Sequence, residues 1–391
     1  MPISPHTRYR PLYSKIIWLC IALLFFTLAN SGTTVIWPLY VKEFISRDAW
    51  IGVLSATLSV FYVLCYFFTI PIIEKYKKAK LAMFSFIGII LLRFFYYFNY
   101  SLFLLVLVML FSRILFVFHK TTLGTIIRDE SRLKDIGKVE GLKYAIVNIG
   151  WLIAPLFAGF IAEYLSVRSY YLISVILFTI GILFFSKVRI KKKFVDGLDS
   201  NFIKNVRDFF SYKDLIKAYI ANIGLSAWWG IVYIYGPLLI IENGLDKRWV
   251  GFFLFLVCVP LIILDYPIGR LLGKVKCRKF YFFGYAIISV CAFLIFLVKS
   301  IYIKIALISL ASFGAALIEP IRESYFFKLV PKKKEEKYYG PFLTSENIGN
   351  SVGTFLASSI LFITSSYSKI FILSSFLMFF FAIFSLLLKK F

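Results

Sequence analysis

The chain has 391 residues, of which 60% are hydrophobic and 20% aromatic, and its formal net charge is +25. A soluble domain is about 45–50% apolar even when glycine is counted, so a soluble fold could not bury this much apolar surface, whereas a lipid bilayer can hold it. The basic residues stand in short clusters between long apolar runs, a pattern that indicates membrane topology rather than nucleic-acid binding.

Long apolar runs recur along the whole chain. A membrane-spanning helix needs about 20 mostly apolar residues. Between the sixth and seventh runs, residues 188–213 are polar and basic, which indicates a linker with a short surface helix near 202–210. The runs predict an all-α integral membrane protein with twelve transmembrane helices. They lie at 15–38, 49–72, 81–98, 101–126, 141–164, 169–187, 214–241, 248–272, 279–298, 301–321, 339–363 and 366–388.

Cysteine and histidine give no sign of a metal site or of a cofactor. The chain has five cysteines and two histidines, and no Cys-x-x-Cys pair occurs among them. The sequence also lacks the Gly-x-x-x-x-Gly-Lys-Ser/Thr loop that an ATP-driven pump would need. We therefore expect no metal, no cofactor and no enzymatic centre.

Lysine and arginine are distributed unequally between the two sets of loops. One set, which includes both ends of the chain and the linker, contains clusters such as the four lysines between 75 and 80. The other set contains isolated basic residues such as Lys42 and Arg168. Basic residues accumulate on the cytoplasmic side of membrane proteins, so this alternation places both termini and the linker in the cytoplasm. We expect a multi-pass protein of the plasma membrane.

Short segments of the first half return in the second half at a constant offset in residue number. A shared offset in separate places indicates two halves in parallel repeat, related by an axis along the membrane normal. We therefore predict two pseudo-symmetric six-helix bundles, 1–187 and 214–391, joined by the linker 188–213. In the fourth and tenth helices, Ile127-Arg128-Asp129 matches Ile321-Arg322-Glu323 at an offset of 194 instead. The segments at the common offset of 199 are Pro38-Leu39 with Pro237-Leu238, Trp50-Ile51-Gly52 with Trp249-Val250-Gly251, and Asn148-Ile149-Gly150 with Asn347-Ile348-Gly349.

Six plus six helices around a basic central loop resemble the major facilitator superfamily, and the resemblance covers the whole chain. The family has a loop between helices 2 and 3 of the form Gly-x-x-x-Asp-Arg-x-Gly-x-Arg-Arg. Here residues 70–80 keep the acid as Glu74 and the first base as Lys75 but have neither glycine. In the family this loop helps to lock the inner gate, which a carboxylate can do by lying against the positive N-terminal end of a neighbouring helix. The resemblance thus implies a gating role for Glu74 and Lys75.

A second motif lies in the fifth run. Gly141, Gly150, Ala154-Pro155 and Gly159 are spaced like the antiporter motif of the family, with Ala154 in place of a glycine. Small residues at this spacing let two helices approach closely, and Pro155 bends the helix. The motif is commonest in drug:proton exporters, so the resemblance implies that Gly150 and Pro155 take part in gating. Tight packing between the two halves is the alternative.

Polar and aromatic side chains form matching stripes on the first and seventh helices, which line the central cavity in this family together with helices 4 and 10. Asn30 and Thr34 share one face of the first helix, and Trp229 and Tyr233 take the equivalent positions of the seventh, which also carries Asn222. We interpret these five residues as substrate-binding, with hydrogen bonding between helices as the alternative. The aromatic faces would suit an apolar or cationic solute.

Charged residues inside the spans are few. Arg113 lies near the middle of the fourth helix, where an arginine costs at least ~2.5–3.5 kcal/mol unless it faces protein or water. We expect Arg113 to bind an anionic group of the substrate or a proton-relay carboxylate, with a structural ion pair as the alternative. Glu319 in the tenth helix is the candidate for proton coupling, and Asp265 in the eighth is the reserve.

The sequence as a whole favours a secondary transporter that works by alternating access. Proton-coupled efflux of an apolar or amphipathic compound, by an antiporter, is the leading hypothesis. Uptake or uniport of a polar or anionic nutrient is the alternative, and a membrane-embedded enzyme is a remote one. The expected partners are a small-molecule substrate, protons and the lipid bilayer, without nucleic acid, and we expect a monomer.

The predicted topology can be tested by chemical labelling. Single cysteines replacing Ser200 and Ser46, in a background without other cysteines, should react from opposite sides of the membrane, because Ser200 lies in the basic linker and Ser46 in a loop of the other set. A membrane-impermeant thiol reagent applied to intact cells should label only the cysteine at position 46. Equal labelling of both positions would contradict the topology.

Overall fold

The computed structural model describes residues 11–131, 136–188, 190, 202–271 and 275–389. Within the helices a few side chains, those of Glu74 and Asp265 among them, lie outside this description. The first six long helices are α1 (Pro11–Lys42), α2 (Asp48–Lys75), α3 (Lys78–Phe98), α4 (Leu102–Glu130), α5 (Ile136–Tyr164) and α6 (Ser169–Ser186). The short α7 (Phe202–Phe209) follows. The second six are α8 (Lys213–Glu242), α9 (Lys247–Leu271), α10 (Cys277–Leu297), α11 (Ile301–Leu329), α12 (Glu335–Thr364) and α13 (Tyr367–Ser385), with one 3₁₀ turn at Lys332–Lys334.

Eleven of these twelve long helices are apolar enough to cross a bilayer. The twelfth, α12, is as long as α8 beside it but carries polar groups such as Ser345 and Glu346 in its interior. A helix can hold such residues in a membrane when they face other helices, and α12 packs against both α8 and α2. The prediction of twelve transmembrane helices in two bundles is confirmed.

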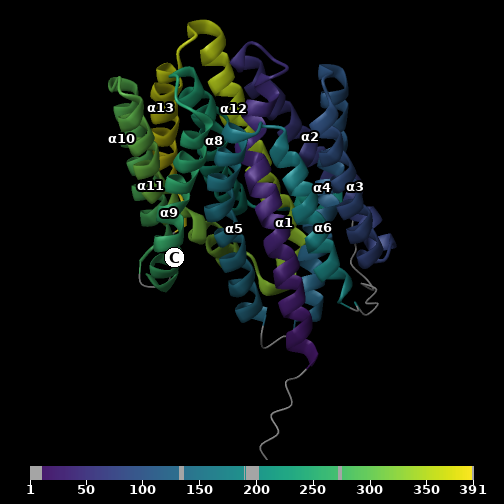
Figure 1. Cartoon of the computed structure of the whole chain (residues 1–391). Helices are drawn as coiled ribbons and strands as arrows, with labels where there is room; N and C mark the ends of the chain where they lie inside the picture. The colour runs from purple at the N-terminus through teal and green to yellow at the C-terminus, as the bar shows by residue number, and fades with distance from the viewer. Residues whose placement is uncertain (1–10, 132–135, 189, 191–201, 272–274, 390–391) are drawn as a thin grey trace, which may run out of the picture.

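The helices form two bundles with matching contacts. In the first bundle α1 packs against α5 and α6, and in the second α8 packs against α12 and α13. Between the bundles, α2 packs against α12 and α5 against α9. Figure 1 shows α9, α10, α11 and α13 on one side, α2, α3, α4 and α6 on the other, and α1, α5 and α8 between them. We call the side of the molecule on which α1 begins the inner side, and the side on which α1 ends the outer side.

The repeat offset seen in the sequence also relates helices that the matching segments do not include. Helix α3 runs from 78 to 98 and α10 from 277 to 297, while α4 runs from 102 to 130 and α11 from 301 to 329. Both pairs keep the common offset of 199 at both ends. The match at an offset of 194, which relates residues 127–129 of α4 to residues 321–323 of α11, is therefore a chance similarity. The equivalent of Glu319 is therefore Lys120, which the shifted match concealed.

Polar contacts hold the outer ends of the two bundles together on both sides. On one side, Arg47 donates to the carbonyl of Phe362 in α12 at 2.8 Å, and its guanidinium lies over the same phenyl ring. On the other side, Glu163 of α5 accepts a hydrogen bond from the backbone N–H of Lys247 at 2.8 Å, and Lys247 Nζ donates to the Ala162 carbonyl at 3.3 Å. The first turns of α2 and α9 thus each lie against the last turns of a helix from the other bundle, which closes the outer side.

Glycines let the two bundles approach at the same place. A β-carbon on Gly251 of α9 would lie 2.5 Å from the Pro155 carbonyl oxygen, and one on Gly159 would lie 2.8 Å from Gly251 Cα. Helices α5 and α9 therefore touch backbone to backbone at this seam. Gly150 has a different place, because its β-carbon would meet Thr27 of α1 at 2.6 Å, inside the first bundle. Of the two residues of the α5 motif that were expected to gate, Pro155 lies between the bundles and Gly150 within one.

The surface helix expected in the linker is α7, which joins the inner ends of both bundles. Phe209 is buried against Tyr219 and Tyr338 of the second bundle, with ring centroids 5.9 and 6.2 Å apart. The ammonium of Lys337 pairs with Asp208 and lowers the pKa of that carboxyl below its ordinary value. On its other side α7 packs against α2 of the first bundle.

A methyl group at the seam should cost stability, and the same change elsewhere should not. Gly251→Ala places a β-carbon against the Pro155 carbonyl, and such overpacking costs about 1–3 kcal/mol. The matched control is Gly124→Ala in α4, where a β-carbon would meet no atom within 4 Å. We expect thermal unfolding in detergent to show a lower Tm for Gly251→Ala and an unchanged or higher Tm for Gly124→Ala. Equal melting temperatures would mean that the seam yields without cost.

Candidate functional site

Four charged side chains form a continuous network across the interface between the bundles. The Glu346 carboxylate of α12 lies 3.7 Å from Lys120 Nζ of α4 and 3.1 Å from an Nη atom of Arg322 in α11. Arg322 also pairs with Glu319 one turn earlier in α11, at 2.9 Å. The network contains two acids and two bases, so its formal charge is balanced. It joins the first bundle, through Lys120, to the second.

Three of these four charges are largely buried. The side chains of Arg322, Glu319 and Glu346 are only 17–28% exposed, whereas that of Lys120 is 57% exposed. Charges at membrane depth are costly unless they face protein or water and find partners. All four belong to at least one ion pair, but Glu319 is satisfied on one side only, because its Oε2 atom is buried and has no hydrogen-bond partner. Its carboxylate can therefore accept one more hydrogen bond or a proton.

Aromatic side chains continue the network on the side of Glu319. The Glu319 carboxylate interacts with the side chain of Trp229 in α8. The Trp229 ring lies 5.6 Å from that of Tyr233, and Tyr233 lies 5.5 Å from Trp151 of α5 in the other bundle. Flat aromatic faces beside a carboxylate suit a solute with apolar surface and a cationic group. We call these three aromatic residues and the four charged ones the interbundle site.

On α1, the predicted residues Asn30 and Thr34 are held in different ways. Thr34 is exposed although it lies in the middle of α1, and its hydroxyl donates to the backbone carbonyl of Asn30 at 2.9 Å. The side-chain oxygen of Asn30 accepts a hydrogen bond from Arg93 of α3, which also donates to the Ala29 carbonyl at 2.9 Å. Arg93 is only 3% exposed. Arg93 therefore fixes the orientation of a predicted site residue, Asn30.

Arg113 lies two turns before Lys120 on the same face of α4. The ring of Tyr62 in α2 is close to both cations. The groups found near the Arg113 guanidinium, Tyr62, Cys65 and Tyr96, all belong to α2 and α3 of the first bundle. Its Nε atom is buried without a partner, and among the described side chains Arg113 has no ion-pair partner. The structural ion pair that was the alternative reading is not found there.

Asn222 and Lys75 lie outside the interbundle site. Asn222 is 1% exposed and donates to the Ser345 hydroxyl at 2.6 Å, so it packs α8 against α12 inside the second bundle. The sequence pattern suggested that Asn222 binds substrate, because such a pattern shows which residues share one face of a helix. It does not show which neighbouring helix covers that face. Lys75 is the exposed last residue of α2, and the side chains of Glu74 and Asp265 lie outside the described residues. Their gating and coupling roles stay predictions.

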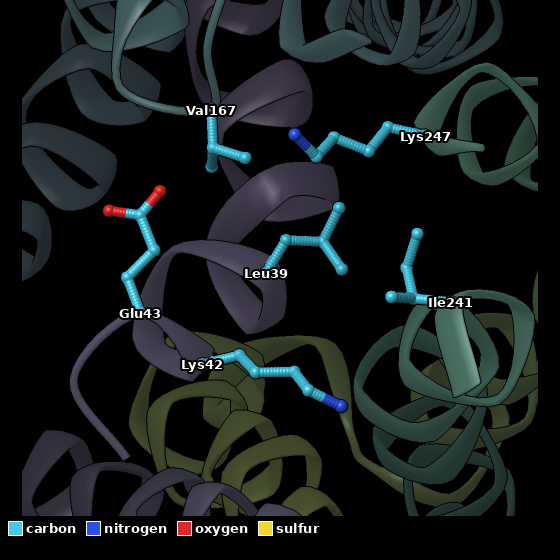
Figure 2. Close-up of a pocket in the computed structure, with 6 residues that line it drawn as sticks. All are labelled: Leu39, Lys42, Glu43, Val167, Ile241 and Lys247. Atoms are coloured by element: carbon cyan, nitrogen blue, oxygen red, sulfur yellow. The ribbon is translucent and has the colours of Figure 1, made fainter. Parts of the chain in front are cut away.

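The structure also contains a pocket at the outer side, which Figure 2 shows. It has a volume of about 210 Å³ and is lined by Leu39, Lys42, Glu43, Val167, Ile241 and Lys247. Its charged groups already have protein partners: Lys42 pairs with Asp48 at 2.8 Å and Glu43 with Arg168 at 2.7 Å. Lys247 donates to a carbonyl, as described above. The pocket is therefore part of the closed outer seam, whereas the interbundle site retains unsatisfied groups.

Three residues of the interbundle site were not found from the sequence. Glu346 lies inside the predicted span 339–363, and an acid within a span is by itself a functional signal. Arg322 lies near the end of the predicted span 301–321, and its pairs with Glu319 and Glu346 could be seen only in the structure. Trp151 could be recognised only once α5 was known to approach α8, because a single tryptophan in an apolar run has no distinguishing pattern.

Comparisons with known proteins agree with this architecture. The sequence matches the profile of the Major Facilitator Superfamily over residues 19–302 and 221–390. No curated protein sequence matches it significantly. Solved structures are similar in fold at low sequence identity, which shows the fold alone.

Three of these structures illustrate the similarity. A POT family transporter in complex with 5-aminolevulinic acid has a TM-score of 0.80 at 12% identity, over 95% of each chain. The nucleoside transporter NupG has a TM-score of 0.80 at 13% identity, over 95% of this chain and 99% of that one. The peptide transporter POT in complex with sulfate has a TM-score of 0.78 at 11% identity, over 95% and 94%.

The different surroundings of two predicted residues lead to different expected phenotypes. Asn222→Ala removes a buried hydrogen bond and should lower the free energy of unfolding by about 1–3 kcal/mol. Trp229→Ala should leave the Tm near that of the unchanged protein but weaken solute binding about tenfold, because the ring borders the interbundle site. Thermal unfolding and ligand titration of both variants check this. If Trp229→Ala binds normally, the aromatic group is packing only.

Proposed function

Because the chain belongs to the major facilitator superfamily, we propose that it is a proton-coupled secondary transporter that takes up a charged, amphipathic small molecule. In this proposal residues 1–187 and 214–391 are the two moving bodies, and 188–213 is the linker between them. The solute binds at the interbundle site and is exposed to one side of the membrane at a time. The fold belongs to a transporter rather than to an enzyme.

The observation that carries the proposal is the charge network that Lys120, Glu346, Arg322 and Glu319 form across the interface. The leading hypothesis from the sequence was efflux of an apolar or amphipathic compound, and an apolar compound could not pair with these four charges. A polar or anionic nutrient, the alternative hypothesis, can pair with them. The structural neighbours are a transporter in complex with 5-aminolevulinic acid, a nucleoside transporter and a peptide transporter, and all of these names indicate polar solutes.

The same network supports coupling to protons. A proton added to Glu346 weakens two ion pairs at once, and one of them, with Lys120, links the two bundles. A proton or a cationic group added to Glu319 uses the carboxylate oxygen that has no partner. Protonation therefore changes the electrostatic energy of bringing the bundles together, and a proton gradient can drive their movement. Glu319 stays the primary coupling candidate, with Glu346 beside it and Asp265 in reserve.

The remaining expectations belong to the same proposal. The clusters of lysine and arginine support a plasma-membrane protein with both termini and the linker in the cytoplasm. The bilayer is then the natural neighbour of the exposed apolar side chains on the outside of the bundles. Each chain has its own interbundle site, so a monomer suffices for transport.

Replacement of Glu319 separates coupling from translocation. Purified protein in liposomes is first screened by thermal stabilisation with amino acids, dipeptides and nucleosides, because a bound solute raises Tm according to its occupancy. With the solute so identified and supplied at saturating concentration, Glu319→Gln should lose accumulation driven by a pH gradient, by about tenfold or more, and keep exchange of labelled for unlabelled solute. The control is Asp214→Asn at the inner end of α8, which should retain both activities. Accumulation by Glu319→Gln at the normal rate would show that coupling lies elsewhere.

A further inference from the structure

Asp48, the first residue of α2, is a buried carboxylate at the outer seam between the bundles. Its side chain is only 9% exposed. The Oδ2 atom accepts hydrogen bonds from Lys42 Nζ of its own bundle, at 2.8 Å, and from the Tyr367 hydroxyl of α13 in the second bundle. The Oδ1 atom is buried and has no hydrogen-bond partner. One oxygen of this carboxylate thus joins the two bundles, and the other can hold a proton.

The first turns of α2 lie directly against the second bundle. One turn after Asp48, a β-carbon on Gly52 would lie 1.9 Å from the Tyr235 hydroxyl oxygen of α8 and 2.3 Å from Ser358 Oγ of α12. These two hydroxyls lie 2.7 Å apart and share a hydrogen bond. If this end of α2 moves away from the second bundle, the hydrogen bond between Asp48 and Tyr367 must break.

The charged groups around Asp48 differ in how strongly they hold the seam. Lys42 lies between two acids, because its Nζ atom is also 3.6 Å from the Glu242 carboxylate of the second bundle. Glu242 is 58% exposed, and an ion pair so open to water contributes little. A proton on Asp48 would therefore leave Lys42 with the weaker of its two partners. The titratable or charged groups that face Asp48 or adjoin it are Lys42 of α1, Tyr235 and Glu242 of α8, Tyr367 of α13 and the preceding Arg47, which donates to the Phe362 carbonyl.

The other side of the outer seam has different chemistry at the equivalent position. Helices α2 and α9 begin at positions related by the repeat, so that Lys247 is the equivalent of Asp48. Lys247 Nζ donates to the Ala162 carbonyl, and this contact involves no carboxylate. The acid on this side, Glu163, accepts from the backbone N–H of Lys247, and a protonated carboxyl group can still accept that bond through its carbonyl oxygen. Protonation therefore costs fewer contacts on the α9 side than on the α2 side.

We propose that Asp48 is a proton-binding residue of the outer seam and that its protonation releases α2 from the second bundle. The proton comes from the outer solution, which reaches this end of α2 because Ser46 and Arg47 are exposed, and it forms an O–H bond at Oδ1. The carboxyl group then has no charge. Its bonds to Lys42 and Tyr367 weaken, since charge-assisted hydrogen bonds are about twice as strong as neutral ones. Acid on the outer side thus favours the state in which the outer side is open. The inference goes beyond the proposed function, because it concerns a second site and requires no solute.

Distances between the outer ends of the bundles test the proposal on the full-length protein. Spin labels on cysteines replacing Phe98 and Leu297, in a background without other cysteines, mark the exposed last residues of α3 and α10, which are equivalent in the repeat. The purified protein is titrated without solute from neutral pH to about pH 4, and the distance distribution is measured by pulsed electron resonance. We expect the ratio of long to short distances to rise about tenfold, the effect of losing one charge-assisted hydrogen bond. A distribution that does not change over this range would overturn the proposal.

Substitutions identify the carboxylate that responds. Asp48→Asn has no charge at this position, so it should show the long distances at neutral pH and no further change in acid. Tyr367→Phe keeps the pair of Asp48 with Lys42 but removes the bond across the seam, and it should also show the long distances at neutral pH. The matched control is Glu163→Gln on the α9 side, which should titrate like the unchanged protein.

Each outcome with these variants decides the assignment. A normal pH response in Asp48→Asn, or its loss in Glu163→Gln, would show that the proton acts elsewhere. Where Asp48→Asn does not fold, short distances at neutral pH and an unchanged titration in Tyr367→Phe would equally overturn the proposal. The measurement uses neither a solute nor a pH gradient, so its result is independent of proton-coupled uptake. Glu319→Gln, which changes the interbundle site, should keep the pH response of the outer ends.

Discussion

The Glu346 carboxylate lies within ion-pair distance of a cation from each bundle, and this arrangement constrains the rest of the site. Loss of the buried partner Arg322 would leave the Glu346 charge uncompensated, which costs about 3–5 kcal/mol, whereas loss of Lys120 costs less because that side chain is 57% exposed and water screens it. Lys120 and Arg322 therefore cannot both leave Glu346 unless a proton or a solute compensates it. Any movement that separates α4 from α12 breaks the contact with Lys120. The electrostatic energy of the network thus depends both on the relative position of the bundles and on whether a proton or a solute occupies the site.

The outer seam is chemically different from this network. There several contacts between the bundles involve main-chain groups, with Glu163 accepting from the first N–H of α9 and Arg47 donating to a carbonyl near the end of α12. A carboxylate at the first turn of a helix also interacts favourably with the positive end of the helix dipole. At Gly251 the backbones of α5 and α9 touch, so no side chain lies between the two helices at that point. A seam of this kind can open at the cost of a few hydrogen bonds, which alternating access requires.

Local sequence patterns predicted the fold well, because in a membrane protein the apolar runs directly mark the segments that cross the bilayer. Run lengths, loop charges and the repeat together predicted twelve helices in two bundles, including α12, whose interior polar residues reduce its apolar character. The site was predicted less well, because it depends on contacts between helices distant in the sequence. Asn222 and Asn30 are both asparagines on central helices. Asn222 is buried and donates to the Ser345 hydroxyl, whereas Asn30 accepts a hydrogen bond from Arg93. Nothing within either helix distinguishes them.

The repeat explains why the side chains, rather than the backbone, decide how a solute is oriented in the site. A pseudo-symmetric scaffold alone would offer a solute two equivalent orientations, with equal energy. Here the equivalent positions of the two bundles differ at three places in or beside the site, with Lys120 against Glu319, Asn30 against Trp229 and Thr34 against Tyr233. The first member of each pair is polar or cationic, and the second is acidic or aromatic. Because the polarity is reversed across the axis, a solute with two unlike ends has one favoured orientation, whereas a solute with two equal ends would gain nothing from the asymmetry.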